Sequence, residues 1–247
     1  MLDLVAPAGS PIPVNFLIKT LFYGLNRKKV GDNLKEKIGK DYDVRRCYLL
    51  NSGRTALFLL LKAMKSIANE NNREVIIPAY TCFSVPSAIV KAGLKIRLVD
   101  IDPETLDYSY SRLESADFRN GLAIIACNLF GITSDVNKLQ DIAAKNQLYL
   151  IDDAAQSMGA RINSKHSGTF GDAGIFSLGR GKNITAYEGG ILVSNNDQIA
   201  EKIESEIDSL RKSSGLSEFK AFNRLALYSL FLRPGLYWIP AKLPFLQ

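Results

Sequence analysis

The chain has 247 residues, 47% of them hydrophobic and 23% charged, a balance that excludes a disordered or fibrous protein. Its three cysteines, Cys47, Cys82 and Cys127, are widely spaced and odd in number, so they predict no disulfide framework and favour a reducing compartment. The net charge of +6 gathers at the two ends of the chain, and the near-neutral middle excludes the clustered basic stripe of a nucleic-acid-binding protein.

The N-terminal segment, residues 1–44, is expected to form an arm and a helix. Residues 1–14 lack the basic and apolar regions of a secretory signal, and no stretch reaches the roughly 18 apolar residues of a spanning helix. We therefore expect a cytoplasmic protein. Residues 1–30 carry four basic side chains and one acid, and residues 219–247 carry four basic side chains and no acid. Such basic, apolar ends favour contact with another subunit or, weakly, with a membrane surface.

Residues 45–212 alternate short apolar runs with helical patterns, which is typical of a parallel sheet with crossover helices. The predicted strands are 74–77, 95–100, 122–127, 148–152, 174–178 and 190–194, and the predicted helices are 53–68, 82–92, 135–145 and 197–212. Asp135 and Asp197 stand where N-cap residues of the last two helices would stand. Beyond this unit, residues 213–247 form an apolar, basic segment interrupted by three prolines.

A first candidate for chemistry lies at the start of the helix 53–68. Ser52 and Gly53 lead directly into apolar residues, so the free backbone N–H groups and the positive end of the helix dipole can hold a phosphate. Ser52 is equally well explained as an ordinary N-cap. Both interpretations stay open on this segment alone.

Two further segments follow strands. The strand 148–152 ends in Asp152 and Asp153, and the carboxyl ends of parallel strands are where α/β proteins bind ligands. The strand 174–178 is followed by Lys182 in a loop that contains Gly179 and Gly181. Either feature alone is also compatible with an inert surface position. Together with the phosphate-binding helix start, they form the set of groups that pyridoxal phosphate requires.

In order, spacing and residue identity, these segments resemble the DegT/DnrJ/StrS family of pyridoxal-phosphate-dependent sugar aminotransferases. The resemblance runs from about residue 47 to 194 and includes the runs 74–81, 99–103 and 168–172. It implies an α/β fold, the large domain of a type I aminotransferase, in which an α/β/α sandwich has a mostly parallel central sheet. It identifies residues 45–212 as the cofactor-binding large domain.

Three residues take chemical roles by this resemblance. Lys182 is the catalytic residue, which binds pyridoxal phosphate covalently and moves the substrate proton once it is released. Asp153 pairs with the pyridine nitrogen and keeps that nitrogen protonated, so the ring can accept electrons. Gln156 contacts the phenolic oxygen of the cofactor.

Five residues are implied for the phosphate and the face of the ring. Ser177 and the backbone of Arg54 and Thr55 match the phosphate-binding positions, although Arg54 replaces the usual threonine. Where most members stack an aromatic residue on the cofactor ring, this sequence has Cys82, with Phe83 beside it. Either side chain is a candidate for that position.

The resemblance implies a homodimer that takes an amino group from an amino acid, glutamate in the family, and transfers it to a nucleotide-linked keto sugar. The family's small C-terminal domain, and the asparagine segment that reaches a neighbouring subunit, find no counterpart in the sequence. Two alternatives stay open. One is dehydration chemistry, although relatives of that kind replace the lysine. The other is an inactive, truncated or regulatory relative that binds a partner or a membrane surface.

His166, the only histidine, lies in the polar stretch 161–168. This stretch predicts a solvated hairpin. No second ligand at zinc spacing accompanies the histidine, so we expect no metal site.

Overall fold

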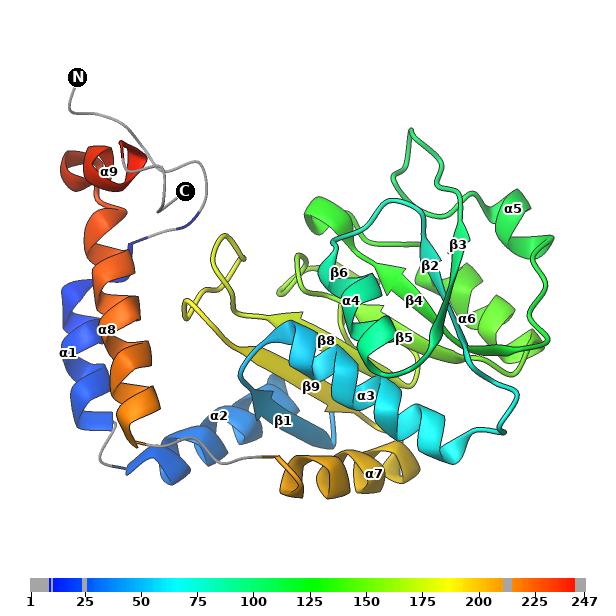
Figure 1. The fold of residues 1–247 in the computed structure, drawn as a ribbon, viewed down its shortest axis with the longest axis horizontal. Coiled ribbons are helices and arrows are strands. Elements are labelled where there is room, and N and C mark those ends of the chain that lie inside the picture. The colour runs from blue at the N-terminus through cyan, green and yellow to red at the C-terminus, as the bar shows by residue number, and fades with distance from the viewer. Residues whose placement is uncertain (1–8, 10, 24–25, 211–214, 243–247) are drawn as a thin grey trace.

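The computed structural model describes residues 9, 11–23, 26–210 and 215–242, which contain a central seven-stranded sheet (Figure 1). The strand order is β1-β9-β8-β5-β4-β2-β3, and β9 alone runs against the other six strands. The strands are β1 (Arg46–Leu50), β2 (Glu74–Pro78), β3 (Lys95–Val99), β4 (Gly121–Cys127), β5 (Tyr149–Asp153), β8 (Ala173–Ser177) and β9 (Gly190–Ser194). The predicted mostly parallel sheet is confirmed.

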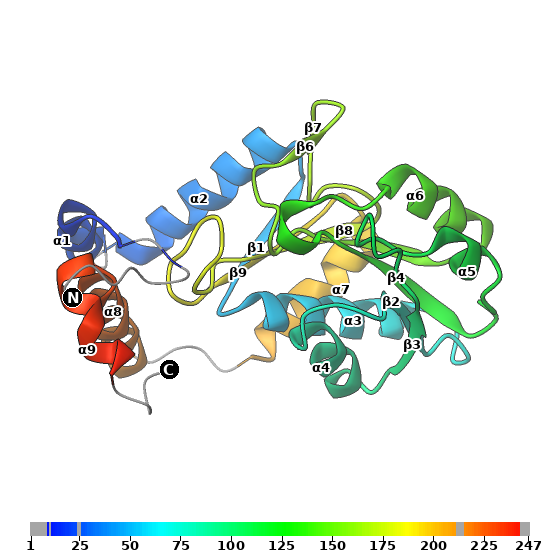
Figure 2. The same cartoon turned by 90° about the horizontal axis from the view of Figure 1, so that it is seen from above.

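Helices cover both faces of the sheet, as the view from above shows (Figure 2). One face carries α3 (Gly53–Ile67), α4 (Ser84–Lys91) and α7 (Asp197–Asp208), and the other carries α2 (Arg27–Tyr42), α5 (Tyr110–Glu114) and α6 (Val136–Lys145). The α/β/α sandwich expected from the sequence is thereby confirmed.

The core follows the two-residue period of the strands. In β8, Ile175 packs toward α3 whereas Phe176 packs toward α2. In β9, Leu192 faces the same side as Ile175, and Ile191 faces the same side as Phe176. All seven residues of β4 are buried. Each fully buried Leu, Ile or Phe side chain contributes about 1.5–3 kcal/mol to folding, so this sheet is a rigid platform for the loops at its carboxyl edge.

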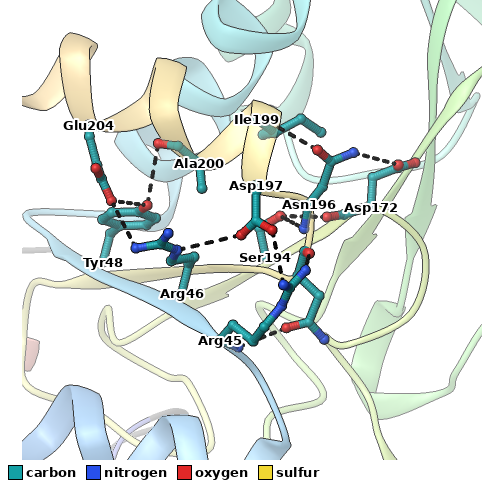
Figure 3. A network of polar contacts seen from close by, with 11 residues as sticks. Arg45, Arg46, Tyr48, Asp172, Ser194, Asn196, Asp197, Ile199, Ala200 and Glu204 are labelled. Atoms are coloured by element: carbon teal, nitrogen blue, oxygen red, sulfur yellow. Dashed lines mark hydrogen bonds and ion pairs between the residues drawn. The ribbon is translucent and has the colours of Figure 1, made fainter.

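The start of α7 corrects one predicted cap. Asn196, not Asp197, is the N-cap, since its side-chain oxygen accepts a hydrogen bond from the backbone N–H of Ile199 at 3.2 Å (Figure 3). Asp197 is the first residue of the helix, and its carboxylate pairs with the guanidinium of Arg45 at 2.9 Å. Asparagine and aspartate cap helices equally well, so the sequence alone does not show which of the neighbouring residues Asn196 and Asp197 is the N-cap. The predicted cap Asp135 is confirmed.

Several elements were not predicted. They are β1, the helix α5, the turn η2 (Leu129–Gly131), and the helices α8 (Gly215–Phe231) and α9 (Pro234–Ala241). The predicted hairpin at 161–168 is present as the short strands β6 (Arg161–Ile162) and β7 (Lys165–His166). Helices α8 and α9 lie together with α1 (Val14–Tyr23) beside the β1 end of the sheet (Figures 1 and 2). We call α1, α8 and α9 the helical arm. Residues 211–214 and 243–247 lie outside the described residues.

His166 is half-buried rather than fully solvated. The residue lies in the predicted hairpin, but its ring stacks on Tyr42 of α2 with 4.2 Å between the ring centres. Its Nδ1 atom is buried without a hydrogen-bond partner, and burial lowers the pKa of the imidazole. Sequence periodicity could not reveal this contact because it joins residues far apart in the chain.

No helix among the described residues is long and apolar enough to cross a membrane.

Candidate functional site

A cavity of about 530 Å³ opens at the carboxyl ends of β2, β4, β5 and β8. It is lined by residues from α3, from the segment after β2, and from the loops that follow β5 and β8. Seven of the eight predicted site residues line it, namely Arg54, Cys82, Phe83, Asp153, Gln156, Ser177 and Lys182. Thr55 lies one residue further along α3 and is not among the lining residues.

Asp153 supplies the buried carboxylate of the cavity. It is the last residue of β5, and its Oδ1 accepts a hydrogen bond from the backbone N–H of Ala155 at 3.0 Å. Burial raises the pKa of this carboxyl to about 6, and the ammonium of Lys182 opposes that rise. A cationic ligand in the cavity would favour the charged carboxylate.

The neighbouring Asp152 serves the fold. Successive residues of a strand face opposite sides, so its carboxylate turns away from Asp153. It accepts hydrogen bonds from Nδ2 of Asn128 at 2.7 Å and from the backbone N–H of Gly168 at 2.6 Å. The backbone N–H of Phe170 lies 3.3 Å from the same carboxylate. Asp152 therefore ties the loop after β7 to the sheet behind the cavity.

Gln156 is oriented by the backbone of the turn after β4. Its Oε1 accepts a hydrogen bond from the N–H of Phe130 at 3.1 Å. The backbone of Phe130 is left-handed, with a φ of 56°, a conformation uncommon for a non-glycine residue. Because this bond occupies Oε1, the amide group offers its Nε2 hydrogens to a ligand.

The N-terminus of α3 forms an anion-binding cradle. The side chain of Ser177 packs so closely on Gly53 that a Cβ added at Gly53 would lie 3.0 Å from the Ser177 Cβ. Ser52 is the N-cap, and its Oγ accepts the backbone N–H of Thr55 at 3.1 Å. The N-cap therefore uses the backbone N–H of Thr55. The backbone N–H groups of Gly53 and Arg54 in the first turn are left to donate hydrogen bonds to a bound anion.

Lys182 lies in the loop between β8 and β9, half-buried at the cavity wall. Gly181 before it has a φ of 72°, which glycine adopts without strain. Arg180 places its guanidinium over the ring of Tyr187, 5.4 Å from the ring centre. The loop therefore brings cations to the cavity, in addition to Arg54, whose guanidinium lies over the ring of Phe83, 5.4 Å from its centre.

Helix α8 contacts this lysine loop from outside. The guanidinium of Arg224 pairs with the carboxylate of Glu188 at 3.0 Å, and the ring of Tyr228 meets that of Tyr187 edge-on, with 5.2 Å between ring centres. Glu188 and Tyr187 both line the cavity. Because α8 belongs to the segment after residue 213, a part of the chain remote in sequence supports one wall of the site.

Sequence analysis missed other residues that line the cavity, including Thr81, Cys127 and Asn128. Cys127 and Asn128 end β4, which neighbours β5, so the strand-end rule that found Asp153 also applies to them. The hydroxyl of Thr81 donates to the sulfur of Cys127 at 3.4 Å. Burial raises the pKa of that thiol well above its ordinary value, which leaves it neutral and inert.

These groups fit pyridoxal phosphate. The cradle at α3 and Ser177 suits a phosphate, the buried carboxylate of Asp153 suits a ring nitrogen, and the amide of Gln156 suits a phenolic oxygen. Lys182 brings an amine to the same cavity. Among the described residues, no cluster of three or more His, Cys, Asp or Glu side chains could hold a metal ion.

Comparison with known proteins identifies relatives of this chain. The sequence model of the DegT/DnrJ/EryC1/StrS aminotransferase family matches residues 23–225. GDP-perosamine synthase from Vibrio cholerae is 32% identical over 177 residues, which are 72% of this chain and 47% of the relative. A pleiotropic regulatory protein from Geobacillus stearothermophilus is 39% identical over 130 residues, 52% of this chain and 35% of the relative.

A solved structure shares the fold. The crystal structure of GDP-4-keto-6-deoxymannose-3-dehydratase with a trapped PLP-glutamate geminal diamine has a TM-score of 0.74 and 26% sequence identity to this chain. The similarity covers 81% of this chain and 54% of that one. The chain thus spans less than half the length of the two curated relatives and about half that of the solved structure. Because the family model covers most of its residues, the chain belongs to the DegT/DnrJ/EryC1/StrS aminotransferase family.

Proposed function

We propose that the chain is a transaminase that moves an amino group from an amino acid to a nucleotide-linked keto sugar, for amino sugar or polysaccharide biosynthesis. Pyridoxal phosphate is the cofactor. The observation that carries the proposal is the convergence of Lys182, Asp153, Gln156 and Ser177 on one cavity. When bound, the cofactor supplies an electron sink for the carbanion that forms as the substrate loses its α-proton.

The cavity residues divide this work. The carboxylate of Asp153 holds the proton on the ring nitrogen, and Nε2 of Gln156 donates to the phenolic oxygen. The Nζ atom of Lys182 would bind the cofactor; once released, it would take the α-proton of the amino-acid substrate as general base and return it, as general acid, to the reacting carbon of the cofactor. Arg54 and Ser177 hold the phosphate.

Two more residues complete the proposed contacts. Thr55 supports the phosphate cradle through its hydroxyl, which lies 3.0 Å from Oγ of the N-cap Ser52. Cys82 or Phe83, which both line the cavity, would contact the face of the cofactor ring. Phe83 is exposed and Cys82 half-buried beside it, where its sulfur accepts a hydrogen bond from the hydroxyl of Ser84 at 3.1 Å.

The substrates are proposed from the relatives. GDP-perosamine synthase is named for an amino sugar carried on a nucleotide, which supports a nucleotide-linked keto sugar as acceptor. Glutamate is proposed as the donor, since the solved dehydratase structure holds a PLP-glutamate adduct. A cytoplasmic homodimer is the proposed assembly, because nucleotide sugars are cytoplasmic metabolites and the sequence resemblance implies a dimer.

The test is reduction of the protein by borohydride in the presence of pyridoxal phosphate, followed by mapping of the labelled peptide. We expect a visible absorbance band, label on Lys182, and bleaching of the band by glutamate. Lys182→Ala should remove the label, whereas Lys165→Ala, a matched change at an exposed hairpin lysine, should leave it unchanged. Label on other lysines alone would contradict the assignment.

A regulatory or inactive relative is the second candidate function. Two observations favour it: similarity to the pleiotropic regulatory protein, and the exposed helical arm through which a partner or membrane could be bound. Absence of any lysine-dependent label would select this candidate. Dehydration is a third possibility on the same scaffold, and product analysis separates it, since a dehydratase yields a deoxy sugar without nitrogen transfer.

A further inference from the structure

Helix α1 is rich in large apolar residues and buries none of its ten residues, of which only Asn15, Lys19 and Thr20 are polar. Its large apolar side chains are between 48% and 68% exposed, and they are Val14, Phe16, Ile18, Leu21, Phe22 and Tyr23. Exposed apolar patches of this kind mark surfaces that bind a protein partner or a membrane. The surface of α1 therefore indicates a covering partner.

The rest of the helical arm extends this apolar surface. Helix α8 exposes Leu216, Phe219, Leu227 and Leu230. Helix α9 buries no residue and carries a tyrosine and a tryptophan. The arm is one unit, since the hydroxyl of Ser229 in α8 bonds both the backbone N–H and the carbonyl of Ile12, just before α1. It projects from one end of the molecule, where a broad flat partner can reach it (Figures 1 and 2).

Charge distinguishes the possible partners. Residues 9–31 and 215–242 hold eight basic side chains and one acidic side chain, Glu218, which forms an ion pair with Arg27. Residues 32–210 hold 21 basic and 23 acidic side chains, so the positive charge is concentrated on the arm and its junction with α2. Two arms brought together as a dimer would repel each other, whereas an anionic surface would attract them.

The contacts within the arm resemble those of interfacial helices. The ammonium of Lys19 lies 5.6 Å from the ring centre of Phe16, and that of Lys242 lies 5.5 Å from the ring of Trp238. The ring of Phe16 is exposed and that of Trp238 is half-buried. Lysines beside aromatic rings at a surface can reach headgroups while the rings enter the boundary with the acyl chains. An acidic protein would satisfy the charges but offers no apolar layer for a helix exposed on every side.

We propose that the helical arm binds the surface of an anionic lipid bilayer. The apolar side chains of α1 enter the headgroup boundary, and basic residues such as Lys28 and Lys29 contact the lipid phosphates and carboxylates. No described helix spans a membrane, so the arm lies along the interface. Exposed side chains of α1 such as Phe22 are not among the residues that line the cofactor cavity, so this proposal does not rest on the proposed transaminase activity.

The test is co-sedimentation of the 247-residue chain with vesicles of phosphatidylcholine alone or with one third phosphatidylserine. We expect pelleting with the anionic vesicles only, and release at high salt because exposed charges are then screened. Lys28→Gln with Lys29→Gln should weaken binding about 25-fold, since each cation near an anionic surface contributes about fivefold. Lys95→Gln with Lys145→Gln, the same charge change on the sheet domain, should have no effect.

A second variant tests the apolar contact. Phe22→Ser removes a side chain that is 68% exposed, so it should leave the thermal unfolding temperature unchanged while it reduces pelleting. Sedimentation velocity without lipid tests the alternative that a second copy of the chain covers the helical arm. Self-association that depends on Phe22, with no pelleting on anionic vesicles, would overturn the proposal. Equal pelleting on neutral vesicles would also overturn it.

Discussion

Strand β4 buries all seven of its residues, whereas helix α1 buries none of its ten, although both are strongly apolar. The strand lies at the centre of the sheet, where helices cover both faces, and the helix lies on an arm beside the sheet (Figure 1). The same kind of residue therefore serves two purposes in this chain. In the sheet domain it stabilises a platform for chemistry, and on the arm it is available for an external partner.

Core truncation should separate the two regions most clearly. Phe176→Ala removes a fully buried ring of β8 and is expected to destabilise the chain by about 3–5 kcal/mol, because the cavity left behind cannot collapse. Phe22→Ala on α1 removes an exposed ring and should change the free energy of unfolding by less than about 0.5 kcal/mol. Urea unfolding measures both. Similar losses in the two variants would mean that the arm is packed as tightly as the sheet.

The paired carboxylates at the end of β5 predict a pH dependence of the cofactor-free protein. Burial raises the folded-state pKa of Asp152 and of Asp153 from 3.8 to about 6. An acid with a raised pKa binds its proton more tightly in the folded state, so its contribution is complete below pH 3.8 and is lost as pH rises through 6. Each carboxyl should lower stability by roughly 3 kcal/mol over this range.

Asp153→Asn should therefore make the cofactor-free protein more stable at pH 7 and reduce the loss between pH 4 and pH 7. The same variant should slow the reaction with glutamate at least about 100-fold, because the ring nitrogen loses the group that holds its proton. Asp102→Asn is the control, since this carboxylate lies in the turn after β3 and does not line the cavity. Stability measured by urea at the two pH values, and amino transfer measured by stopped-flow absorbance, give independent readouts.

Removing the contact between the helical arm and the lysine loop should have the smallest effect of the changes considered. Arg224→Ala removes an exposed ion pair to Glu188, and such pairs contribute about 0.2–1 kcal/mol. We expect cofactor affinity to fall by about two- to fivefold. Combining Glu188→Arg with Arg224→Glu should restore most of it, while Arg233→Ala serves as the control. An unchanged affinity in Arg224→Ala would show that α8 does not support the loop.

The sheet domain was predictable because its signals are local. Apolar runs of strand length and helical periodicity identify the six predicted strands of the sheet, and the strand-end rule indicates Asp153 and Lys182 as site candidates. The role of Gln156 came from the family resemblance. Strand β1 was missed because the run 47–50 is as compatible with a buried helix turn as with a strand.

The rest depends on contacts between distant segments. Nothing near Arg224 in the sequence indicates that it meets Glu188, 36 residues earlier. The stacking of His166 on Tyr42 and the hydrogen bond that orients Gln156 are of the same kind. Helices α8 and α9 were obscured by Pro234 and Pro240, although proline is compatible with the first turn of a helix, where Pro234 lies.

The most direct measurement is the mass-spectrometric location of the label left by borohydride in the presence of pyridoxal phosphate. The account predicts label on the peptide that contains Lys182, and its loss in Lys182→Ala but not in Lys165→Ala. It also predicts that glutamate added before borohydride prevents labelling. Label spread over surface lysines, or label on Lys182 that glutamate does not affect, would contradict the proposed transaminase.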